Sequence, residues 1–112
     1  MKIYHNPRCS KSRQGLALLK EANVDLEIIE YLKNPLTESE LEALLKKLKI
    51  PAIELIRKNE AIWKEQFINK SLNETELIEA MIAFPKLIER PIVVNGDKAV
   101  IGRPLEKISA II

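Results

Sequence analysis

Apolar residues recur with helical spacing in several stretches of the chain, and capping residues mark where the helices begin. Apolar positions at core spacing predict a first helix from Ser10 to about Ala22. Thr37 and Glu40 have the spacing of a capping box, in which each side chain bonds the backbone N–H of the other residue. The leucines that follow predict an amphipathic helix, because they are spaced three and four residues apart: Leu41, Leu44, Leu45 and Leu48.

Three shorter helical segments are predicted in the middle of the chain. The first runs from Ala52 to about Arg57, and the second from Glu60 to Phe67. Asn73 and Glu76 give a second capping signal, and the helix that they open must end before Pro85. The middle of the chain is therefore expected to be a helical block over about residues 37–84.

Apolar runs at both ends of the chain predict the strands. Met1–Tyr4 and Val24–Ile29 flank the first helix, which makes a βαβ unit with two parallel strands. Ile92–Val94 and Lys98–Ile101 flank Asn95-Gly96, a pair that supplies the positive φ angles of a type I′ turn. The second pair of runs is therefore expected to be a β-hairpin.

The order of these elements predicts the fold class. Pro104 is well placed as the first residue of a closing helix, which runs from Leu105 to about Ala110. The order is then β-α-β, a helical block, and β-β-α. This is the order of a thioredoxin-like α/β fold, a mixed β-sheet flanked by helices, with a helical insertion between the second and third strands. We expect residues 1–112 to form a single domain.

Composition and charge limit the possible partners and compartment. The chain has 112 residues, with 18 Lys and Arg against 16 Asp and Glu, which gives a net charge of +2. This near balance favours neither nucleic acid nor a membrane as a partner. The single cysteine excludes an internal disulfide, and no signal peptide or long apolar run is found. We therefore expect a cytoplasmic protein, which we predict to be a monomer.

Cys9 and His5, each the only residue of its type, lie where the first strand gives way to the first helix. The backbone N–H groups and the dipole at a helix N-terminus favour a thiolate over a thiol, and they can also bind an oxyanion. Ser12, three residues after the cysteine, can place its hydroxyl on the same face. A lone cysteine is often a small buried apolar residue, but cations adjoin this one: Arg8, Lys11 and Arg13. These neighbours favour a reactive thiolate.

Four motifs in order along the chain resemble the ArsC-type arsenate reductase family. They are Tyr4-His5-Asn6-Pro7-Arg8-Cys9 with Ser12-Arg13, Leu55-Ile56-Arg57-Lys58-Asn59, Arg90-Pro91-Ile92-Val93-Val94, and Gly102-Arg103-Pro104. The resemblance implies that Cys9 is the nucleophile and that three arginines bind the oxyanion: Arg57, Arg90 and Arg103. It also implies supporting roles for four further residues: His5, Ser12, Arg13 and Pro91. Pro91 is expected to follow a cis peptide bond and to bring Arg90 to the thiolate.

The number of cysteines constrains the reaction that this resemblance implies. Reduction of arsenate to arsenite takes two electrons, whereas one cysteine supplies only half of a disulfide. An external thiol must therefore take part, and glutathione is the expected co-substrate, with a glutaredoxin-like partner to reduce the mixed disulfide. We expect no bound cofactor and no metal.

Three other functions are compared with the residues of this chain by the motif that each one needs. A low-molecular-weight phosphatase loop needs an arginine six residues after the cysteine, where this chain has Gly15. A regulator like Spx would use a Cys-x-x-Cys switch, and Ser12 occupies the second of those positions. A general glutathione-dependent thiol oxidoreductase stays open, because a thiolate in a cationic pocket does not by itself identify the oxyanion.

Overall fold

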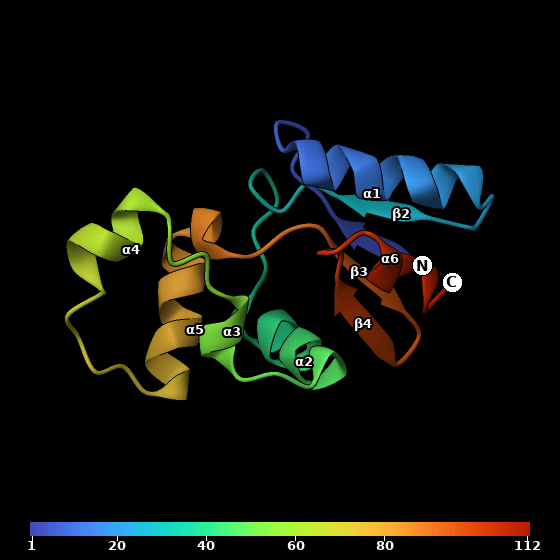
Figure 1. Cartoon of the computed structure of the whole chain (residues 1–112). Coiled ribbons are helices and arrows are strands. Elements are labelled where there is room, and N and C mark those ends of the chain that lie inside the picture. The colour runs from blue at the N-terminus through green and yellow to red at the C-terminus, as the bar shows by residue number, and fades with distance from the viewer. The chain divides into compact units, whose positions relative to one another are not determined.

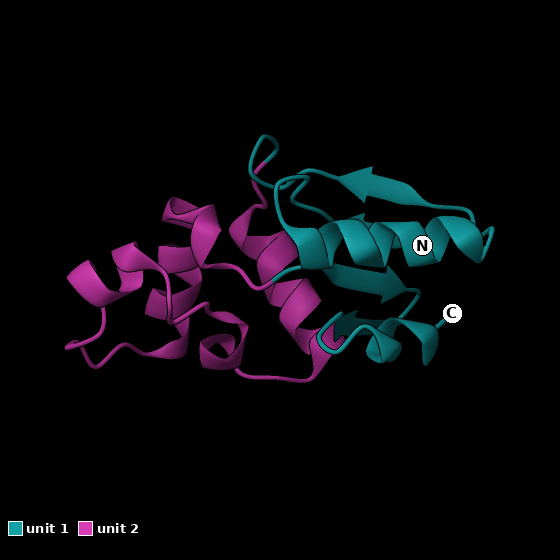
Figure 2. Cartoon of the chain, turned by 45° about the horizontal axis from the view of Figure 1, so that its top comes forward, with its two compact units in different colours: residues 1–34, 90–112 teal, residues 35–89 magenta.

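The computed structural model describes all 112 residues and divides them into two compact units (Figures 1 and 2). The first unit comprises Met1–Asn34 and Arg90–Ile112, and the second comprises Pro35–Glu89. The second unit therefore interrupts the first in sequence, at the place where the helical insertion is predicted. The assignment of the whole chain to a single domain stays a prediction.

A mixed four-stranded sheet forms the centre of the first unit. Its strands are β1 (Lys2–Tyr4), β2 (Glu27–Ile29), β3 (Ile92–Asn95) and β4 (Lys98–Ile101), arranged in the order β2-β1-β3-β4. β1 pairs with β2 in parallel, whereas β3 is antiparallel to both β1 and β4. The α/β class with a mixed sheet is therefore confirmed.

Two helices of the first unit, α1 (Ser10–Glu21) and α6 (Glu106–Ser109), share a core with this sheet (Figure 1). Ile3 of β1 lies opposite Val93 of β3, so the two side chains lie on the same face of the sheet. Both are fully buried in one cluster with Leu19 of α1 and Ile108 of α6. This packing fixes the N-terminus of α1 just beyond the carboxyl end of β1.

Five short helical elements make up the second unit. They are α2 (Glu38–Leu48), α3 (Ala52–Leu55), α4 (Ala61–Gln66), α5 (Glu74–Ala83) and the 3₁₀ helix η1 (Pro85–Leu87). Both predicted capping boxes are formed, since Thr37 accepts a hydrogen bond from the Glu40 N–H at 3.2 Å and Asn73 accepts one from the Glu76 N–H at 2.8 Å. The helical insertion between β2 and β3 is therefore confirmed.

The hairpin between β3 and β4 turns one residue later than the sequence predicts. Asn95 pairs with Lys98 as the last pair of the ladder, so Gly96 and Asp97 form the turn. Gly96 has a φ of +64°, whereas Asn95 and Asp97 do not have positive φ angles. A type II′ turn needs a positive φ at its first central residue alone. The predicted type I′ turn at Asn95-Gly96 is therefore wrong.

Two predicted elements of the first unit are longer than the observed ones. β2 begins at Glu27 rather than Val24, because β1 supplies only three residues for pairing. The closing helix begins at Glu106, so Pro104 is not its first residue. Pro104 instead accepts a hydrogen bond from the Lys107 N–H at 3.1 Å, within a turn that leads into α6.

One helix of the second unit, α3, also ends earlier than predicted. α3 stops at Leu55 rather than near Arg57, because Ile56 forms an antiparallel bridge with Ile88. A backbone that pairs in this way must be extended, and it cannot continue a helix.

Two glycines of the first unit lie against the side chains of Pro91 and Ile108. A Cβ atom on Gly15 would lie 3.0 Å from Pro91 Cγ and 3.1 Å from Ile108 Cδ1. A Cβ atom on Gly102 would lie 2.9 Å and 2.7 Å from the same two atoms. Both glycines therefore allow close packing around Pro91.

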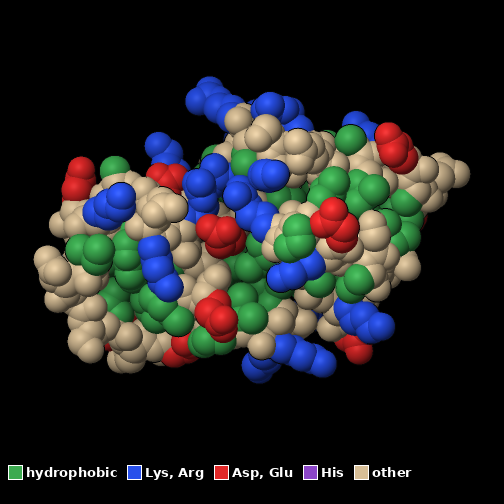
Figure 3. Space-filling view, in the orientation of Figure 1, with side chains coloured by type: hydrophobic (Ala, Val, Ile, Leu, Met, Phe, Trp, Pro, Cys, Tyr) green, Lys and Arg blue, Asp and Glu red, His purple; other side chains and the backbone are tan.

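Charged side chains of both signs lie among apolar ones on the face that Figure 3 shows. Lys and Arg are interspersed with Asp and Glu on the face that Figure 3 shows, and no histidine is visible there. None of the helices combines the length and the apolar character that a bilayer crossing requires.

The capping box of α2 gives a prediction about stability. Thr37→Ala removes the side-chain acceptor of the Glu40 N–H, so the free energy of unfolding should fall by about 1 kcal/mol. Urea denaturation would measure this change. Ser39→Ala is the matched control, because Ser39 is exposed in the same first turn and should change the free energy of unfolding by less than about 0.5 kcal/mol. Equal losses in the two variants would contradict a capping role.

Candidate active site

Cys9 is the N-cap residue of α1, where the chain leaves β1 and its following loop. Its backbone is extended, with φ −96° and ψ 122°. Its N–H donates to the Asn6 carbonyl at 3.0 Å, and its own carbonyl accepts from the Arg13 N–H at 3.0 Å. These bonds fix the backbone on both sides of the sulfur, and the partly exposed side chain stays accessible to a substrate.

Burial raises the pKa of the Cys9 thiol, but its polar and charged neighbours lower it by more. The backbone N–H of Ser12 lowers the pKa most, followed by hydrogen bonding and charge from Arg90 and then by the N–H of Lys11. The net pKa is therefore below its usual value, although the sulfur makes no capping hydrogen bond within α1. The helix N-terminus acts as predicted, and the cation that contributes most is Arg90 rather than a neighbour in sequence.

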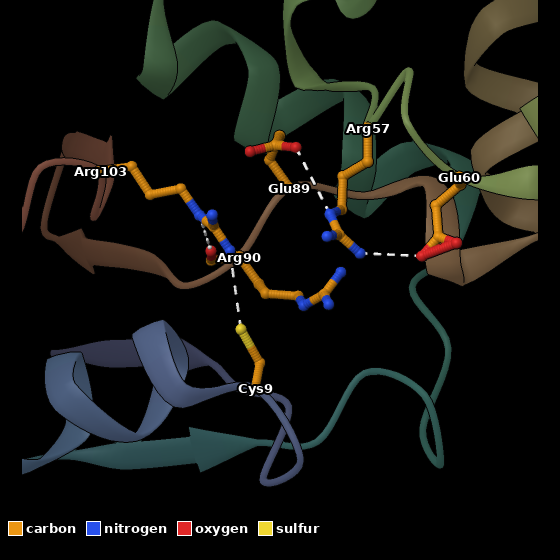
Figure 4. Close-up of polar contacts among 6 residues, drawn as sticks. All are labelled: Cys9, Arg57, Glu60, Glu89, Arg90 and Arg103. Carbon is orange, nitrogen blue, oxygen red and sulfur yellow. Dashed lines mark hydrogen bonds and ion pairs between the residues drawn. The ribbon is translucent and has the colours of Figure 1, made fainter.

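Two arginines from the segments that flank the β3–β4 hairpin lie at this sulfur (Figure 4). Nη2 of Arg103 is 3.6 Å from Sγ of Cys9, and Nε of Arg103 donates to the carbonyl oxygen of Arg90 at 2.8 Å. The second bond ties the two flanking segments to each other. The structure therefore brings together three of the predicted site residues, Cys9, Arg90 and Arg103.

Arg90 precedes Pro91, and the peptide bond between them is cis, as predicted. Nε of Arg90 is buried and has no hydrogen-bond partner. A buried donor without a partner is costly, so such groups are usually satisfied by a protein group, a water or a ligand. This atom is therefore a donor that a bound anion could satisfy.

His5 is buried, with 4 % of its surface exposed, and it contacts Ser12 rather than the sulfur. Nδ1 of His5 lies 2.7 Å from Oγ of Ser12, and the same Oγ accepts a hydrogen bond from the Asn6 N–H at 3.0 Å. Burial lowers the pKa of His5, which the charge of Glu30 opposes, so the imidazole is neutral near pH 7. The Ser12 hydroxyl is thus occupied inside the loop, and Ser12 acts on the sulfur through its backbone N–H.

The loop before α1 is held by further polar contacts. Nη1 of Arg13 donates to the Pro7 carbonyl at 3.0 Å, and the Arg8 N–H donates to Oδ1 of Asn6 at 3.0 Å. Arg13 therefore supports the loop, a role that the sequence leaves open. Asn6 was not singled out as a site residue, although its place before Pro7 is a signal for a turn.

Arg57 belongs to the second unit, where two carboxylates contact it (Figure 4). Its Nη1 donates to Oε1 of Glu60 at 2.8 Å, and its Nε lies 3.6 Å from Oε1 of Glu89. Neither partner was predicted from the sequence, although Arg57 and Glu60 have the i,i+3 spacing of an ion pair. The convergence of Arg57 with Cys9 stays a prediction.

Comparison with known proteins finds one family over almost the whole chain. The model of the ArsC family matches residues 4–111. The "Uncharacterized protein YfgD" of Escherichia coli (strain K12) is 51% identical over 100% of this chain and 96% of its own length. A Neisseria meningitidis protein (serogroup B, strain MC58) named "Arsenate reductase" is 41% identical over 100% of this chain and 97% of its own length.

A solved structure shows the same fold. "Arsenate reductase from Vibrio cholerae" superposes with a TM-score of 0.94 at 40% identity, and the match covers 100% of this chain and 98% of that one. This likeness confirms the thioredoxin-like fold that the order of elements predicts.

The contacts of the sulfur predict how its reactivity depends on pH. The thiolate is the reactive form, so the rate of alkylation by iodoacetamide should rise through an inflection below that of free cysteine. Arg90→Ala should move the inflection to higher pH, because the variant loses a hydrogen bond and a charge that favour the thiolate. Arg8→Ala is the control, since Arg8 is exposed and adjoins Cys9 in sequence. A larger shift in the control than in Arg90→Ala would overturn this account.

Proposed function

The chain belongs to the ArsC family, and we propose that it is an arsenate reductase in which Cys9 is the nucleophile. The observation that carries the proposal is the contact of Arg103 with Sγ of Cys9 at 3.6 Å, beside the unpartnered Nε of Arg90. It places a thiol of lowered pKa among fixed cationic donors. Relatives of nearly the same length, named arsenate reductase, support the choice of oxyanion.

The arginines would hold the oxygen atoms of arsenate. A guanidinium group presents its donors in a plane and can bind two oxygens at once, which suits a tetrahedral dianion better than a lysine does. Arg103 is held by its bond to the Arg90 carbonyl, so its guanidinium group is in place before substrate binds. In this proposal Arg57 is the third arginine of the oxyanion site, oriented by Glu60 and Glu89.

The first step forms a bond between sulfur and arsenic. The Cys9 thiolate attacks arsenic, and one oxygen leaves with its electron pair as hydroxide or water. Arg90 and Arg103 compensate the negative charge on the remaining oxygens. Arsenic stays in its +5 state, because sulfur replaces oxygen as a ligand and no electrons are transferred to arsenic.

The second step supplies the two-electron reduction and needs an external thiol, for which we propose glutathione. Its thiolate forms a disulfide bond with Cys9 as the bond between sulfur and arsenic breaks. The electron pair of that bond stays on arsenic, which leaves as arsenite. A glutaredoxin-like thiol then attacks the glutathione sulfur of the mixed disulfide and releases Cys9 as a thiolate.

A general glutathione-dependent thiol oxidoreductase is the main alternative, because it would use the same thiolate. The two functions differ in what they need from the arginines. A neutral disulfide gains little from a planar array of donors, whereas a tetrahedral oxyanion depends on it.

Replacement of Arg90 by lysine separates the two functions. Arg90→Lys keeps the positive charge, so alkylation of Cys9 by a neutral reagent should change little. The loss of the planar donor pair should lower kcat/KM for arsenate by about ten- to a hundredfold, with glutathione and glutaredoxin supplied. Arg8→Lys is the matched control, since Arg8 is exposed. Equal small effects of Arg90→Lys on both reactions would reject arsenate as the substrate.

The dependence on partners gives a second test. Cys9→Ser should abolish arsenate turnover while its far-ultraviolet circular dichroism stays that of the wild type. The wild type should show no multiple-turnover reduction of arsenate when no thiol is added, because its single cysteine supplies only half of a disulfide. Sustained turnover without an added thiol would show that the proposed stoichiometry is wrong.

A further inference from the structure

The guanidinium donors beside Cys9 suit any oxygen atom that gains negative charge next to the sulfur. Nη2 of Arg103 lies 3.6 Å from Sγ of Cys9, and Nε of Arg90 is a buried donor without a partner (Figure 4). Arg103 is also fixed by its bond to the Arg90 carbonyl at 2.8 Å. All three residues belong to the first unit, so the donors are in place before any ligand arrives.

The sulfur itself is open to small oxidants. Cys9 is partly exposed, and its neighbours favour the thiolate, which is the form of cysteine that oxidants attack. A small molecule with an oxygen–oxygen bond can therefore reach the sulfur from solvent. One of its oxygen atoms would meet the sulfur, and the other would lie against the donors of Arg90 and Arg103.

We propose that Cys9 also reduces hydrogen peroxide and small alkyl hydroperoxides, with Arg90 and Arg103 as donors to the leaving oxygen. The thiolate attacks one peroxide oxygen, so a sulfur–oxygen bond forms and the oxygen–oxygen bond breaks. The other oxygen leaves with the electron pair of that bond and takes a proton from solvent, which gives water or an alcohol. The sulfur is oxidised by two electrons to a sulfenic acid, and the peroxide is reduced by two electrons.

The single cysteine decides what happens to the sulfenic acid. The chain has no second thiol, so a small external thiol attacks the sulfenic sulfur, water leaves, and a mixed disulfide forms. A second molecule of that thiol attacks the mixed disulfide and releases Cys9 as a thiolate. One peroxide and two thiols thus give one disulfide, one water and a second water or an alcohol. This cycle needs no arsenate, so it does not depend on the proposed function.

The arginines should accelerate reaction with peroxide more than alkylation by iodoacetamide. Charge develops on a small oxygen atom when the peroxide bond breaks, and this atom is a strong hydrogen-bond acceptor. In alkylation the charge develops on iodide, which is large and a weak acceptor. A hydrogen bond from a fixed cationic donor to the leaving oxygen should change the rate by about tenfold or more. The ratio of the two rate constants separates this effect from the amount of thiolate, because both reactions use the thiolate.

The test measures this ratio in the reduced, thiol-free chain and in free cysteine. Hydrogen peroxide is added, and the sulfenic acid is captured with dimedone and quantified by mass spectrometry. The ratio for Cys9 should exceed that of free cysteine by about tenfold or more. Arg90→Lys and Arg103→Lys keep the charge but lose the guanidinium donors, so each should lower the ratio by about tenfold. Arg8→Lys is the matched control, since Arg8 is exposed, and it should leave the ratio unchanged.

Each outcome bears on the peroxide reaction without reference to arsenate. A wild-type ratio no higher than that of free cysteine would overturn the inference, and this comparison does not require any variant to fold. The same ratio in the wild type and in both lysine variants would also overturn it, because the donors would then take no part. A high ratio that both lysine variants lose would support peroxide reduction, whether or not the chain turns over arsenate.

Discussion

The opposition between burial and charge at one sulfur atom governs the site. Partial burial of Cys9 favours the neutral thiol, and the chain overcomes it with backbone N–H groups of Ser12 and Lys11 and with Arg90. The N–H groups come from local structure, since any residue at this position of a helix would meet them. Arg90 comes from a segment more than eighty positions away in sequence. The sheet makes that contribution possible, because β3 lies beside β1 and places the loop before it next to the start of α1.

The local part of this arrangement could be predicted from residue chemistry alone. The turn at Asn6-Pro7 and the helical spacing after Ser10 were enough to place Cys9 at a helix N-terminus. The capping boxes could also be predicted, because their bonds join residues three positions apart. The positions of the distant arginines could not be predicted in this way. Only the resemblance to a family singled out Arg90 and Arg103, since no local pattern says that a surface cation will reach a particular thiol.

The predicted turn of the hairpin is wrong by one residue, because a shift of one residue changes the pattern of apolar and polar positions very little. Asn95 and Gly96 are the better turn pair by propensity, yet the register with β4 keeps Asn95 in the ladder and leaves the turn to Gly96 and Asp97. The Ser12 hydroxyl shows a different limit, because a helical projection places it near the sulfur. His5 and the Asn6 N–H take it instead. A side-chain hydroxyl can form hydrogen bonds with several groups nearby, and the sequence does not show which of these bonds forms.

The two glycines packed around Pro91 limit which substitutions this protein can accept during evolution. Charges around the sulfur sit on long side chains, and many replacements there leave the backbone where it is. Gly15 and Gly102 have less latitude, because a Cβ atom at either position would press on the side chains of Pro91 and Ile108. A methyl group at either position would push on the segment that carries Arg90. Two positions without a side chain of their own are therefore less free to vary than the charged positions, and new substrate preferences are more accessible through the charged residues around the sulfur than through the packing around Pro91.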